Sequence, residues 1–101
     1  MIYRVRTISL TSGTTEDARA LASKAAAYAT EHFADVTVEI LTNIAGPQHQ
    51  IHMVTRCQSL AALETYEERR KEDAGWLALV EEWHTRQLGG ESVDRLYRSV
   101  S

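Results

Sequence analysis

The sequence predicts a single α+β domain over residues 1–101, with one layer of helices covering a four-stranded antiparallel sheet. The first observation is the order of the periodic segments, which runs strand, helix, strand, strand, helix, strand. The second is that these segments fill almost the whole chain, without a linker or a low-complexity stretch. The third is the length of 101 residues, which fits one domain and is short enough that dimerisation would add useful buried surface.

The first half of the chain predicts strand, helix and strand. Residues 2–10 are rich in β-branched side chains and end at the turn-forming Thr11-Ser12-Gly13. A helix is expected over about residues 15–32, capped by Thr14 in a capping-box-like arrangement with Asp17. Its apolar face consists mainly of small residues that allow close packing on a sheet: Ala18, Leu21, Ala22, Ala25 and Ala29. Strict alternation over residues 35–42 predicts the second strand.

The second half predicts a strand, a broken helical region and a strand. Residues 49–56 alternate, and Gly46-Pro47 marks a hairpin loop before them. A helical region follows from Ser59 to Leu88, but as one rod it would be about 44 Å long, more than the roughly 33 Å expected for a domain of this size. We therefore expect a break at residues 73–75. Gly89-Gly90 should end the second helix, and residues 92–100 should form the last strand.

This order, with right-handed crossovers, places the first and third strands centrally and both helical regions on one face. The predicted fold is therefore ferredoxin-like, βαββαβ, with a bare second face. We assign to that bare face the residues Arg4, Arg6, Thr37, Leu41, His52, Val54, Arg56 and Leu96. Such a mixed surface predicts a homodimer in which two bare faces meet and the arginines pair with Glu39 or Asp94.

Composition argues against several classes of function. A net charge of −3 opposes a surface that neutralises phosphates, so no nucleic-acid partner is expected. No apolar run is long enough to span a bilayer and the chain begins with a strand pattern, so we expect a cytoplasmic protein without membrane contact. Cys57 is the only cysteine, which excludes an intrachain disulfide and zinc sites built on paired cysteines. We expect Cys57 to be a buried, unreactive residue at a strand end.

The element order, the length and two segments together resemble a known superfamily. These segments are Ser59-Leu60-Ala61-Ala62-Leu63-Glu64 and the run from Asp73-Ala74-Gly75-Trp76 to Trp83. They are similar to the dimeric α/β-barrel superfamily, near its antibiotic-biosynthesis-monooxygenase-like and NIPSNAP-like branches. The resemblance implies a dimer whose sheets close into a barrel, and a pocket between the helices and the sheet of each subunit. The activities of the superfamily are diverse, so the fold alone does not select one.

Aromatic side chains are the main candidates for a ligand site. Trp76 and Trp83 lie two helical turns apart on one face, where they serve either as core anchors or as walls of an aromatic-binding pocket. Tyr3 and Tyr97, on the terminal strands, are candidates to offer hydroxyl groups. We assign Trp76, Trp83, Tyr97 and Met53 to substrate binding.

Histidine is the natural candidate for proton transfer near neutral pH, and we assign a catalytic role to His49 with Tyr3. His49 and His52 should point to opposite faces of a strand, so no metal site is expected. His84 beside Trp83 raises haem binding as an alternative. The haem-degrading branch also uses an asparagine near the first strand, whereas the only asparagine here is Asn43 in the hairpin loop. No cofactor is therefore expected.

Two functions from different classes follow. The first is a homodimeric small-molecule-binding protein, in its most specific form a cofactor-independent monooxygenase that removes a proton from an aromatic or polyketide-like substrate before oxygen attacks the carbanion. The second is a non-enzymatic interaction dimer whose aromatic residues are only core. The charged run over residues 67–73 is expected to be a solvated, self-paired helix surface under either function.

Overall fold

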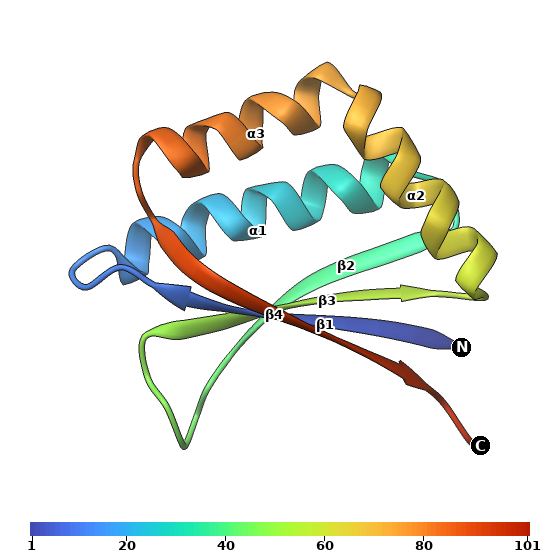
Figure 1. Ribbon diagram of the computed structural model, residues 1–101, viewed down its shortest axis with the longest axis horizontal. Coiled ribbons are helices and arrows are strands. Elements are labelled where there is room, and N and C mark those ends of the chain that lie inside the picture. The colour runs from blue at the N-terminus through green and yellow to red at the C-terminus, as the bar shows by residue number, and fades with distance from the viewer.

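The predicted fold is confirmed by a computed structural model that describes residues 1–101. All three helices cover one face of a four-stranded antiparallel sheet of order β2-β3-β1-β4 (Figure 1). Strands β1 and β3 are central, as predicted. The elements in chain order are β1 (Ile2–Leu10), α1 (Thr15–His32), β2 (Val36–Thr42), β3 (Gln50–Cys57), α2 (Leu60–Glu72), α3 (Ala74–Thr85) and β4 (Gly89–Arg98).

The predicted helix break lies at Asp73, which separates α2 from α3 and caps the second of them. The extended backbone of Asp73 ends α2, and its carboxylate accepts a hydrogen bond from the backbone N–H of Trp76 at 2.8 Å. The hydroxyl of Tyr28 on α1 also donates to this carboxylate at 2.6 Å. Asp73 therefore ties the corner between α2 and α3 to α1, which sets the position of α3 over the sheet.

The two predicted caps, Thr14 and Ser59, have different outcomes. Ser59 caps α2 as expected, because its hydroxyl accepts a hydrogen bond from the N–H of Ala62 at 3.1 Å. The prediction that Thr14 caps α1 through its side chain is wrong. Its hydroxyl donates instead to the carbonyl oxygens of Thr11 and Leu88, so it joins the turn after β1 to the segment before β4.

The end of α3 and the start of β4 also differ from the prediction. The helix ends at Thr85 rather than Leu88, because Gln87 adopts a left-handed backbone conformation with φ of 53° that a helix cannot continue through. Leu88 is then fully buried beside α1, and Gly89 already pairs with Leu10 of β1. Gly89 and Gly90 are thus the first residues of the last strand.

The core lies between the helices and the sheet. Small residues of α1 are buried against the strands as predicted, and they let this helix approach the sheet closely. One cluster gathers around Phe33, Tyr66 and Trp76, and a second around Leu21 and Leu88. Cys57 is buried in the first cluster at the end of β3, as expected.

The assignment of Arg4, Arg6 and Leu96 to the bare face is wrong. Arg4 lies opposite Leu96 and Arg6 opposite Asp94 in the β1–β4 register, and residues directly opposite share a face. Arg4 is an even-numbered residue of β1, like the buried Ile2 and Leu10, and therefore lies on the same face of the strand. It is only 2% exposed beneath the helices. In β1 the odd-numbered and the even-numbered residues both include apolar and polar side chains, so the alternation of the sequence does not show which set faces the helices.

The bare face consequently carries the odd-numbered residues of β1 and β4. Tyr3, Val5 and Thr7 lie on it, and the register places Tyr97 and Val93 beside them. The predicted members from β2 and β3 are correct: Thr37, Leu41, His52, Val54 and Arg56. Leu41, Val93 and Tyr97 are each about half exposed in the single chain.

Among the helices, none combines the length and apolar character needed to cross a membrane.

Candidate functional site

An amphipathic groove opens between α1, α3 and the sheet. Its volume is about 210 Å³, and nine of its thirteen lining residues are hydrophobic. Helix α1 supplies Leu21, Ala22 and Ala25; α3 supplies Trp76, Leu79, Val80, Trp83 and His84; the strands supply Arg6, Ile8, Met53, Gly90 and Ser92. A cavity of about 150 Å³ admits benzene, so this groove has room for an aromatic ring.

The two tryptophans of α3 line the groove together. Trp76 is largely buried and packs edge-to-face on Phe33, with ring centroids 6.5 Å apart, so it is both a core anchor and a wall. Trp83 is only partly buried, and its indole lies against the backbone of Gly89. A Cβ atom at position 89 would come within 2.6 Å of the Trp83 ring. The first glycine of β4 therefore makes room for this wall.

A cluster of charged residues lies at one end of the groove. Arg6 lines both the groove and an adjoining open hollow, whose other lining residues include Glu67, Arg70 and Lys71. Trp76 and Val80 also line both, so the groove and the hollow adjoin. The site therefore has an apolar part under α3 and a polar part under α2.

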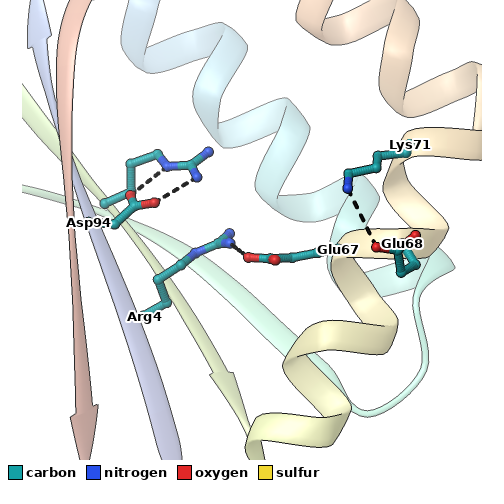
Figure 2. A network of polar contacts seen from close by, with 6 residues as sticks. Arg4, Glu67, Glu68, Lys71 and Asp94 are labelled. Carbon is teal, nitrogen blue, oxygen red and sulfur yellow. Dashed lines mark hydrogen bonds and ion pairs between the residues drawn. The ribbon is translucent and has the colours of Figure 1, made fainter.

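Two ion pairs cross from element to element within this cluster. Arg4 of β1 points to Glu67 of α2, and Asp94 of β4 accepts two hydrogen bonds from Arg6 at 2.7 and 2.9 Å (Figure 2). The bidentate bond from Arg6 lowers the pKa of Asp94 and raises that of Arg6. Lys71 and Glu68 form a separate, exposed pair along α2.

The third arginine of the cluster has no carboxylate partner. Arg70 stacks over the rings of Tyr66 and Trp76, at 4.5 and 5.1 Å from their centroids. Its Nε is buried without a hydrogen-bond partner, as are Nε and Nη2 of Arg4 and the hydroxyl of Tyr66. Burial lowers the pKa of Arg70 and raises that of Tyr66, since both charged forms are poorly solvated there.

Three of the residues assigned to substrate binding, Trp76, Trp83 and Met53, meet in the groove. Tyr97, the fourth, does not. It pairs with Tyr3 on the bare face of the sheet, away from the helices. A role for these two tyrosines would require a ligand on that opposite face.

His49 also lies away from the groove. It lines a small polar hollow with Asn43, Gln48 and other polar residues beside the β2–β3 hairpin. His52 is on the bare face, where its ring nitrogens contact the Thr7 hydroxyl at 2.9 Å and the Asn43 side-chain oxygen at 2.6 Å. His84 is the histidine that lines the groove.

Sequence reasoning missed the charged part of the site. The expectation that the run over residues 67–73 is a solvated, self-paired surface is wrong for three of its residues. Glu67 pairs with Arg4, and Arg70 lies over the rings of Tyr66 and Trp76. Asp73 accepts a hydrogen bond from Tyr28. One usable signal is Tyr66 four residues before Arg70, since both fall on one helix face.

No family model and no curated protein matches the sequence. Solved structures do match in shape. An uncharacterized NIPSNAP domain protein from Burkholderia xenovorans has a TM-score of 0.84 at 12% identity, covering 100% of this chain and 96% of its own. A NIPSNAP family protein of unknown function from Agrobacterium tumefaciens has a TM-score of 0.81 at 19% identity, covering 98% of this chain and 87% of its own. A putative antibiotic biosynthesis monooxygenase from Nitrosomonas europaea has 0.77 at 12%, covering 100% of both chains.

These likenesses span the entire domain. They show that this chain shares the fold of NIPSNAP and monooxygenase-like proteins, the two groups that its sequence resembles. With 12–19% identity to these proteins, the shared fold does not carry an activity over to this chain.

Proposed function

We propose that this protein is a homodimeric, cytoplasmic small-molecule-binding protein whose groove takes a flat, mainly apolar molecule. The observation that carries the proposal is the aromatic-walled groove of about 210 Å³. The alternative of a non-enzymatic interaction dimer predicts a closed helix–sheet interface in which Trp76 and Trp83 are only core. An open groove with both tryptophans in its lining favours a ligand.

Titration with 2-naphthol, a neutral two-ring phenol, tests the proposal. Trp76 and Trp83 are the only tryptophans, and both line the groove, so binding should quench tryptophan fluorescence saturably. Val80→Phe should fill the groove and abolish binding. Ala78→Phe, which adds the same ring to an exposed position of the same helix, should leave it unchanged. Equal quenching in both variants, or none in the wild type, would contradict the proposal.

The dimer is the second part of the proposal and is supported by the uncovered apolar side chains of the bare face. Val93→Glu, at a 51% exposed bare-face position, should convert the dimer to a monomer. Leu96→Glu is the matched control, since Leu96 is 57% exposed on the same strand but points to the helix side. Sedimentation equilibrium should give twice the chain mass for the wild type and the control. A monomeric wild type at high micromolar concentration would overturn this part.

We include cofactor-independent oxygenation as the specific reaction to test. It is supported by the aromatic groove together with a fold shared with the Nitrosomonas europaea protein. In such a reaction a CH₂ carbon of the substrate loses a proton and the carbanion adds to O₂ to form a hydroperoxide. Loss of water then leaves a ketone, so one oxygen atom stays in the product and the other leaves as water. Oxygen uptake with anthrone that is lost in Val80→Phe and kept in Ala78→Phe would support it. Binding of anthrone without oxygen uptake would remove the oxygenase and leave a binding protein.

A further inference from the structure

We infer that the arginine cluster beside the groove is a carboxylate subsite, so that the natural ligand is a flat apolar molecule carrying one carboxylate. This inference depends on the proposed function, because it concerns the polar end of the same ligand. Its basis is the charge and hydrogen-bonding state of Arg4, Arg6 and Arg70.

The cluster holds one cation more than it can pair. Arg4 is matched by Glu67 and Arg6 by Asp94, whereas Arg70 has no ion-pair partner. The remaining cation at the hollow, Lys71, is paired with Glu68. Three inward-facing arginines against two carboxylates leave a single positive charge, which one monoanion would neutralise.

Placing this charge under the helices is costly without a ligand. Several N–H groups of Arg4 and Arg70 and the Tyr66 hydroxyl are buried without partners, although buried polar groups normally find one. Burial and the nearby charges of Arg4 and Arg6 lower the pKa of Arg70. A bound anion would favour the charged form of Arg70 and supply an acceptor for its N–H groups.

The geometry favours a carboxylate on an aromatic body. Contact with the Tyr66 and Trp76 rings restrains the Arg70 guanidinium, which reduces the entropy lost when this side chain binds a planar anion. The hollow lined by Arg70 adjoins the groove and shares Arg6, Trp76 and Val80 with it. A molecule whose rings lie between Trp76 and Trp83 can therefore direct one polar group towards Arg70.

A matched pair of ligands tests the inference: 6-hydroxy-2-naphthoic acid and its neutral carboxamide. Wild-type protein should bind the acid about tenfold more tightly than the amide, since a hydrogen bond to a charged group contributes more than a neutral one. Arg70→Met keeps an apolar stem over the rings and should bring the two affinities within about twofold of each other, mainly by weakening binding of the acid. Arg70→Gln is the second variant and replaces Arg70→Met if that protein does not fold.

Arg69→Met is the control, because Arg69 is the neighbouring arginine and is exposed outside the cluster. It should keep the preference for the acid. Equal affinities of wild type for acid and amide would overturn the subsite and leave the proposed function standing. A preference that persists in both Arg70 variants would overturn the role of Arg70. Failure of both ligands and of 2-naphthol to bind would instead contradict the proposed function itself.

Discussion

Glycine at position 89 determines where Trp83 can lie. A methyl group there would meet the Trp83 indole, whereas a Cβ atom at the adjacent Gly90 would lie 4.0 Å from its nearest neighbour, the carbonyl oxygen of Ser9. Gly89→Ala should therefore displace the indole and lower the free energy of unfolding by about 1–3 kcal/mol. It should also shift the tryptophan emission maximum.

Gly90→Ala provides the comparison for this prediction, because it adds the same methyl group one residue later in the same strand. It should change the free energy of unfolding much less. Urea denaturation of both variants measures the difference. Equal stability of Gly89→Ala and wild type, with unchanged tryptophan emission, would mean that Trp83 does not lie against the backbone of Gly89.

Asp73 makes the α2–α3 corner sensitive to acid. The hydrogen bond from Tyr28, followed by that from the N–H of Trp76, holds the pKa of the Asp73 carboxyl below its usual value. A lowered folded-state pKa stabilises the protein at pH values above the unfolded-state pKa of about 3.9. This stabilisation is lost as the pH falls from there through the folded-state pKa.

Asp73→Asn should therefore be less stable than wild type at neutral pH, and the difference should shrink as the pH falls below about 4. Urea denaturation at neutral pH and at about pH 3 measures it. Glu72→Gln removes a neighbouring exposed carboxylate that makes no hydrogen bond and serves as the control. A destabilisation by Asp73→Asn that is the same at both pH values would exclude this origin.

At the scale of single elements, α2 begins at a cap that the sequence already indicates. The Ser59 hydroxyl accepts from the N–H of Ala62, so Ser59→Ala should lower the free energy of unfolding by about 1 kcal/mol. Ser23→Ala, at an exposed position within α1, should be neutral or slightly stabilising because alanine is the better helix former. Thermal unfolding of both variants distinguishes a cap from a general effect of removing serine.

Element boundaries are predictable where a local signal fixes them. The alternation of β2, the alanine face of α1 and the break at Asp73 depend on neighbouring residues, and the structure has them. The end of α3 depends instead on the buried contact of Leu88 with residues far away in the chain. In β1 the helices cover the even-numbered side chains, and the sequence of the strand alone does not show whether the even-numbered or the odd-numbered set is covered.

For the whole molecule, the site joins residues that are distant in sequence. Arg4, Arg70 and Asp94 come from β1, α2 and β4, and only the sheet register and the bend between α2 and α3 bring them together. The aromatic half is predictable because Trp76 and Trp83 share one helix face. The polar half is less so, because charged residues on a helix are usually solvated. The spacing of Tyr66 and Arg70 distinguishes Arg70 from Arg69, but no local pattern places Arg70 beside Arg4 and Asp94.

The central claim, that the ligand lies under α3, is tested most directly by methionine methyl NMR during titration with 2-naphthol. The chain has only two methionines: Met53, buried in the groove lining, and Met1, exposed at the terminus. Ring currents from a bound naphthol should shift the Met53 methyl signal saturably and leave that of Met1 unchanged. Saturable tryptophan quenching with no shift of Met53 would contradict the account.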